Sequence, residues 1–193
     1  MGCDIHLYRE KKVSGDWVTA DVWEEQDDGD DGVYFEVPWR NRFTDRNYKL
    51  FGLLSKGVRC EIPFAFKERG IPFNASKEVV DNSTRWEGDG HSHSYLYLHE
   101  LKDMSEFIQK ASINVTGMME RDQLKKLQDS IRSGSPDWNL LYPYCRMGGS
   151  SSYVDFDIDV PAAFIMANCL DSIISSFDGV DGDNHRIVFW FDN

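Results

Sequence analysis

The two ends of the chain show the clearest alternation of hydrophobic and polar positions. Residues 2–10 alternate as a half-buried strand does, with Cys3, Ile5 and Leu7 on its apolar face. Residues 185–193, HRIVFWFDN, read as a strongly apolar final strand. Because the two apolar runs complement each other, we predict that these strands lie in the same sheet. Asp192 then falls near the edge where the polar face of the first strand emerges.

The pattern between these strands predicts both strands and helices. Further strands are expected at 17–23, 33–39 and 153–160. Helical spacing of apolar residues predicts helices at 46–59, 76–86, 99–110, 119–134 and 161–177. Residues 60–76 are typical of an ordered loop. The acidic segment 24–32 has no apolar residue to anchor it, so we expect a mobile loop that is dispensable for folding.

The order of these elements indicates the α+β class. We find no repeat and no flexible linker, and 193 residues suit a single domain spanning residues 1–193. Strands at both ends with helices between them predict a largely antiparallel sheet that includes both terminal strands. Helices pack on this sheet, and long ordered loops connect the elements.

The charge of the chain narrows the range of partners. Acidic residues number 33 and basic residues 21, a formal net charge of −12, so we expect no direct binding to duplex nucleic acid or to anionic membrane surfaces. No apolar run is long enough for a membrane span. The four cysteines form no CxxC pair and suit buried thiols in a reducing compartment. We therefore expect a cytoplasmic protein. The oligomeric state stays open.

Three of the five histidines lie in the segment GDGHSHSYLYLHE, residues 88–100. If the segment is extended, Asp89, His91 and His93 share the strand period and point to one side. Imidazole and carboxylate are the usual ligands of zinc and manganese, so the three are candidate metal ligands. The alternative is a polar turn whose side chains cap backbone amides.

A second carboxylate–imidazole pair lies on the first strand. Asp4 and His6 are two residues apart and share the polar face, where they can hold a metal ion or act as an oriented base. The alternative is a polar strand face in water. We predict that the pair converges with the histidine segment in one site for a divalent ion, Zn, Mn or Mg. His99 and Glu100 are the candidate catalytic or ligand-orienting groups beside it.

The segment near residue 40 is the only locally basic patch. Arginines alternate there with aromatic residues, and the combination is suited to gripping a phosphate or stacking on a base. The candidate ligand-binding residues are Arg40, Arg42, Arg46 and Tyr48. The alternative is the edge of a core whose arginines extend to solvent.

Other polar segments favour structural interpretations. Asp155, Asp157 and Asp159 fall on one strand face and could bind Mg²⁺, but a solvated outer sheet face is the stronger interpretation. The aspartate-rich segments 27–32 and 178–185 lack EF-hand spacing. Residues 145–152, CRMGGSSS, precede a strand and read as a plain loop.

Four segments of the chain resemble a family of uncharacterised bacteriophage and prophage proteins. They are MGCDIHLY, RNYKLFGLLSKGVR, GDGHSHSYLYL and RIVFWFDN, and together they span nearly the whole chain. The resemblance implies a phage accessory protein of the bacterial cytoplasm, a type that often counters host defence or alters host metabolism. It implies no activity and no site residues.

Two classes of function fit these observations. The first is a metal-dependent hydrolase or phosphodiesterase that acts on a small phosphorylated or nucleotide-like ligand. The second is a non-enzymatic acidic protein that inhibits a host defence protein or sequesters a ligand. A stoichiometric metal on which activity depends would favour the first, and tight binding without metal the second.

Overall fold

The computed structural model describes residues 2–27, 29, 32–86, 88–141, 153–166, 168–177, 180 and 182–193. The chain divides into two compact units. The first contains Met1–Ser105 and Asn168–Asn193, and the second contains Glu106–Ala167.

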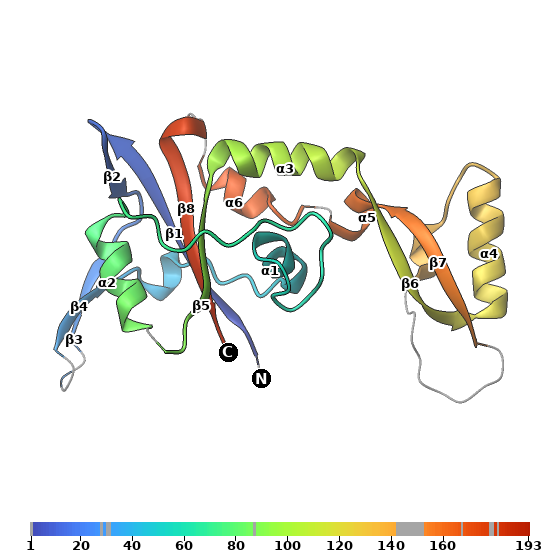
Figure 1. The fold of residues 1–193 in the computed structure, drawn as a ribbon, viewed down its shortest axis with the longest axis horizontal. Coiled ribbons are helices and arrows are strands. Elements are labelled where there is room, and N and C mark those ends of the chain that lie inside the picture. Colours follow the sequence, from blue (N-terminus) through green and yellow to red (C-terminus); the bar gives the residue numbers. More distant parts are fainter. Residues whose placement is uncertain are drawn as a thin grey trace. The chain divides into compact units, whose positions relative to one another are not determined.

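The first unit is built on a four-stranded antiparallel sheet with the order β2-β1-β8-β5 (Figure 1). Its strands are β1 (Asp4–Val13), β2 (Asp16–Thr19), β5 (His91–Tyr97) and β8 (His185–Asp192). β8 lies between β1 and β5, and six of its eight residues are buried. A strand covered on both faces needs a continuous apolar run. The sequence IVFWF, which follows Arg186, supplies this run.

A helix covers each face of this sheet (Figure 1). Helix α2 (Lys77–Arg85) buries Val79 in a cluster with Tyr8, Val188 and Trp190. Helix α1 (Tyr48–Leu54) places Phe51 against Phe191, with ring centroids 5.1 Å apart. Val188 and Trp190 alternate with Phe191 along β8, so the two helices pack on opposite faces.

An ion pair is buried inside the first unit. Arg186 Nε donates to Glu10 Oε2 at 2.7 Å, and both side chains are almost completely buried, with 1% and 0% exposed. The second Glu10 oxygen accepts from the Ser76 backbone N–H at 2.5 Å, at the start of α2. The Arg186 guanidinium also lies 4.0 Å from the centroid of the Trp17 ring. The pair therefore ties together β1, β2, β8 and α2.

The remaining elements of the first unit are short. A β-hairpin joins β3 (Glu24–Asp27) to β4 (Val33–Glu36), and a 3-10 turn, η1 (Trp39–Asn41), follows it. Helix α6 (Asp171–Ser175) and the 3-10 turn η3 (Gly182–Asn184) precede β8. Helix α3 (Leu98–Lys110) begins in the first unit directly after β5.

The second unit is a two-stranded antiparallel sheet with helices packed on it. β6 (Ser112–Glu120) pairs with β7 (Tyr153–Pro161) along its whole length. The apolar side chains of this sheet pack with α4 (Arg121–Arg132), the 3-10 turn η2 (Trp138–Leu141) and α5 (Ala162–Met166). Asp155, Asp157 and Asp159 are exposed on the outer face of this sheet, where Asn114 Nδ2 donates to Asp157 and Asp159, in agreement with the structural interpretation of that aspartate stripe.

The α+β class and the pairing of the two terminal strands in one antiparallel sheet are confirmed. Two local expectations are wrong. Part of the acidic segment, Glu24–Asp27, forms β3 because β4 supplies it with a pairing partner. The helix expected at 161–177 is split into α5 and α6, and Asn168 has a φ of +62°, a conformation that ends a helix. Residues 145–152 lie outside the described part of the chain.

None of the helices in the described ranges is long and apolar enough to cross a membrane. Cys3, Cys60 and Cys169 are free thiols, as expected, and Cys145 lies outside the described residues.

Candidate functional site

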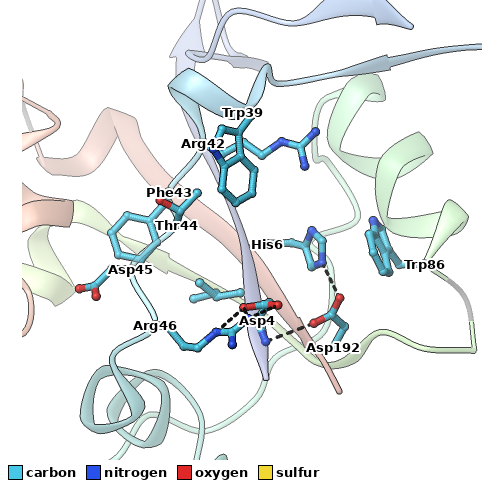
Figure 2. Close-up of a pocket in the computed structure, with 11 residues that line it drawn as sticks. Asp4, His6, Trp39, Arg42, Phe43, Thr44, Asp45, Arg46, Trp86 and Asp192 are labelled. Atoms are coloured by element: carbon cyan, nitrogen blue, oxygen red, sulfur yellow. Dashed lines mark hydrogen bonds and ion pairs between the residues drawn. The ribbon is translucent and has the colours of Figure 1, made fainter. Parts of the chain in front are cut away.

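A pocket of about 460 Å³ lies beside the polar end of β1 (Figure 2). β1 contributes Asp4 and His6, the end of β8 contributes Asp192, and the turn after α2 contributes Trp86. The segment from η1 to α1 forms the rest of the lining: Trp39, Arg42, Phe43, Thr44, Asp45 and Arg46. Two of the regions selected from the sequence, the first strand and the basic–aromatic segment, therefore meet here.

His6 and Asp192 form a side-chain pair in this pocket. The two strands pair so that Asp4 lies opposite Asp192 and His6 opposite Trp190. His6 Nε2 lies 3.3 Å from Asp192 Oδ2, and the Asp4 backbone N–H donates to Asp192 Oδ1 at 3.2 Å. The expected position of Asp192, beside the polar face of the first strand, is confirmed. The carboxylate is fixed from two sides and in turn orients the imidazole.

Burial keeps His6 neutral around pH 7. It lowers the pKa of His6 below its ordinary value of 6.5, although the hydrogen bond to Asp192 opposes this. An ionised carboxylate only accepts hydrogen bonds, so Nε2 carries the proton in the neutral ring. Nδ1 then keeps its lone pair. This is the tautomer of an oriented general base.

The two arginines of the pocket are already paired with carboxylates. Arg46 binds Asp4 in a forked arrangement, with Nε 2.8 Å from Oδ1 and one terminal nitrogen 2.6 Å from Oδ2. Arg42 lies 2.6 Å from Glu36 and donates from Nε to the Val37 carbonyl at 2.6 Å. These partners hold the guanidinium groups in place and also neutralise much of their charge.

Aromatic rings form two sides of the pocket (Figure 2). Trp86 contacts the His6 ring, with centroids 4.2 Å apart, and Trp190 stacks on the same imidazole with centroids 5.4 Å apart. Trp39 is 74% exposed, which is unusual for so large an apolar side chain. A flat ligand that stacked on Trp39 would cover that ring.

His91 and His93 do not share a face, contrary to the expectation from their spacing. His91 lies opposite Phe191, but Ser94 lies opposite Phe189, so two residues of β5 stand against one of β8. Ser92, with a φ of +55°, forms part of this bulge. His93 consequently stacks on Trp190, with centroids 5.6 Å apart, and His91 stacks on Phe191 on the other face.

Trp190 separates His6 from His93, since both imidazoles stack on this ring from neighbouring strands. The structure therefore does not bring His6, His91 and His93 together around one point. Asp89 is exposed in the turn before β5. In the described part of the chain, no three His, Cys, Asp or Glu side chains gather closely enough to hold a metal ion.

The other candidate residues do not line this pocket. His99 Nδ1 lies 3.1 Å from Asp183, at the exposed start of α3. Glu100 accepts from both terminal nitrogens of Arg69, at 2.6 and 2.9 Å, and from the Tyr97 backbone N–H. Arg40 pairs with Glu24. Tyr48 lies under the Arg59 guanidinium at 5.6 Å.

Asp192, Trp39 and Trp86 line the pocket but are not among the site residues predicted from the sequence. Asp192 could have been selected, because the predicted pairing of the terminal strands already placed it beside Asp4 and His6. Trp39 belongs to the basic–aromatic segment, so the mixture of arginines and aromatic residues that selected its neighbours could have selected it as well. Trp86 follows a short helix, and no pattern in the sequence relates it to His6.

The chain matches no protein-family model, and no curated protein or solved structure is significantly similar to it. The function is therefore inferred from the geometry of the pocket.

His6 and His93, two partly buried histidines that stack on Trp190, predict a pH-dependent stability. Burial lowers the pKa of both His6 and His93, so the unfolded chain binds protons at a higher pH than the folded protein. The free energy of unfolding should therefore fall as the pH drops below 6.5, until both folded-state pKa values are passed.

Urea unfolding at several pH values between 8 and 5 measures this effect. All of these pH values lie above 4.5, the ordinary pKa of Glu100, and the ion pair with Arg69 helps to lower that pKa. The titration of Glu100 therefore stays outside the range that is measured. The variant His6→Gln/His93→Gln should show a flatter dependence. Equal slopes for the variant and the wild type would contradict the prediction.

Proposed function

We propose that the His6 pocket binds a small nucleotide-like ligand and hydrolyses a phosphoester bond in it. The observation that carries the proposal is the neutral His6 imidazole, which Asp192 orients and which contacts the rings of Trp86 and Trp190. A flat base would stack on the exposed Trp39 ring. Arg42 and Arg46 stand in the same pocket to meet the phosphate.

The reaction uses His6 as a general base. A water molecule attacks the phosphorus atom while His6 Nδ1 accepts its proton, and the P–O bond to the leaving group breaks. The leaving oxygen then takes a proton from the imidazolium. Asp192 stabilises the positive charge on the ring during this exchange, as an oriented carboxylate does for histidine bases in general.

The charge of the pocket supports a role for a divalent cation. Its lining contains two arginines and three aspartates, and each arginine is paired with a carboxylate. A phosphate would add negative charge to a lining that has no surplus of positive charge. Mg²⁺, Mn²⁺ or Zn²⁺ bound together with the phosphate would offset this. Asp4 and Asp192 are the carboxylates beside His6 that would help to hold it.

The biological setting is part of the same proposal. The four segments that resemble phage and prophage proteins support an accessory role in the bacterial cytoplasm. A hydrolase of nucleotide-like ligands would act there by removing a small molecule on which host defence depends.

A screen with the purified protein tests the proposal. Linear and cyclic mono-, di- and trinucleotides are incubated with Mg²⁺, Mn²⁺, Zn²⁺ or EDTA, and products are separated by liquid chromatography with mass detection. Calorimetry on the same panel measures binding. The proposal expects a hydrolysed nucleotide and a loss of turnover in EDTA.

Two other outcomes have definite meanings. Binding without turnover would replace hydrolysis by sequestration of the ligand in the same pocket. Neither binding nor turnover across the panel would reject both functions for this pocket.

A further inference from the structure

A second hollow, of about 730 Å³, runs between β4 and α2 and shares no lining residue with the His6 pocket. One wall consists of three consecutive residues of β4, and the other consists of α2 residues that recur every three to four positions and therefore lie on one helix face. The lining is Val33, Tyr34, Phe35, Lys77, Glu78, Asp81, Asn82 and Arg85, with Thr19, Asp21 and Trp23. We call it the β4–α2 groove.

The groove follows the edge of a strand. Consecutive residues of a strand point to opposite faces, so a hollow lined by three in a row runs along its edge. In the described ranges of the chain, β4 pairs only with β3. The other edge of β4 therefore presents backbone N–H and C=O groups that an added strand would pair with.

The side chains on the outer side of the groove are apolar and exposed. Val33 is 61% exposed and Phe35 is 52% exposed, and these alternate residues lie on one face of β4. Tyr34, between them, faces α2, where the Arg85 guanidinium lies 3.3 Å from its ring centroid. The groove thus combines a free strand edge with apolar contact surface, the two features of sites that bind extended peptides.

The charge around the groove favours a basic occupant. Lys77 pairs with Asp81 within α2, and Glu78 lines the same wall. Glu25 and Asp27 lie opposite Phe35 and Val33 in the hairpin, on the same face. The segment 24–31 contains six acidic residues. A second copy of the chain would bring another net charge of −12, so self-association here is opposed by repulsion.

We propose that the β4–α2 groove binds an extended segment of a partner protein in which basic and apolar residues alternate. The segment adds to the free edge of β4 as a third strand. Its apolar side chains cover Val33 and Phe35, and its basic side chains lie on the other face of the added strand, towards the Glu78 carboxylate of α2. The site is independent of the His6 pocket and of any hydrolysis there.

Fluorescence anisotropy with a labelled hexapeptide that alternates lysine and valine tests the proposal. The peptide should bind, with an affinity that falls as salt is raised. A glutamate–valine hexapeptide should not bind. A lysine–valine peptide N-methylated at alternate residues, which removes the backbone donors of one edge, should bind much more weakly.

Matched protein variants locate the binding site. Phe35→Ser and Glu78→Lys should each weaken binding by about tenfold or more, as the loss of a central contact does. Phe73→Ser and Glu106→Lys make the same chemical changes at exposed positions outside the groove and should leave binding intact. Circular dichroism confirms that each variant is folded.

Several results would overturn the proposal. These are absence of lysine–valine peptide binding at millimolar concentration, unchanged binding of the N-methylated peptide, and equal losses in the groove and control variants. A dimer in size-exclusion chromatography that Phe35→Ser dissociates would assign the groove to a second copy instead.

Discussion

Replacing Arg186 by methionine is expected to lower the free energy of unfolding by about 3–5 kcal/mol, the cost of leaving a buried charge without its partner. Glu10 is completely buried, and Arg186 supplies its charged hydrogen bond. In the variant, the Ser76 backbone N–H alone remains to stabilise the carboxylate. Methionine keeps much of the side-chain volume, so the effect reports the lost charge more than a cavity.

Urea unfolding followed by circular dichroism measures this difference. The double variant Glu10→Leu/Arg186→Met removes both charges and should be more stable than Arg186→Met alone. Arg132→Met is the matched control, because the Arg132–Asp129 pair is exposed, and it should cost less than about 1 kcal/mol. A similarly small loss for Arg186→Met would show that the buried pair contributes no more than a surface one.

Replacing His6 by glutamine is expected to slow hydrolysis of the ligand found by the nucleotide screen by about 100- to 10,000-fold, the usual contribution of a general base. The glutamine amide still donates to Asp192 but accepts no proton at neutral pH. Binding should change much less than turnover, because Trp39, Arg42 and Arg46 are retained. In the wild type, turnover should persist below pH 6.5, since burial lowers the pKa of His6, and should fall at more acidic pH.

His93→Gln is the matched control for this measurement. His93 stacks on the same Trp190 ring as His6 but does not line the pocket. Its turnover should remain close to that of the wild type. Equal losses in the two variants would indicate a structural role for the histidine–tryptophan stack and would remove His6 from the reaction.

Patterns that depend on one strand or one helix could be predicted from the sequence. The alternation of Asp4 and His6 with apolar residues places both on one face of β1, and the apolar run of β8 marks it as a buried strand. Together these two features predict the pairing that sets Asp192 beside His6. The part of the candidate site that β1 and β8 form, with Asp4, His6 and Asp192, therefore follows from periodicity.

The rest depends on features that periodicity does not encode. In an unbroken strand, His91 and His93 would lie on the same face. Ser92 adds one residue to β5, and this places them on opposite faces. Trp86 reaches His6 only because α2 packs over the sheet, which is a tertiary contact. β3 consists of Glu, Gln and Asp, and its extended conformation comes from pairing with β4 rather than from intrinsic preference.

The central place of β8 also bears on how the chain folds. β1 and β5 are made early, but each pairs with a strand that begins at residue 185, so neither can complete its ladder until nearly all of these 193 residues are synthesised. Contacts between such distant segments raise the contact order and slow folding, because a long loop must close before the contacts form. The second unit contains β6 and β7 within residues 106–167 and needs no later segment. We expect residues 106–167 to gain structure on the ribosome before the four-stranded sheet does.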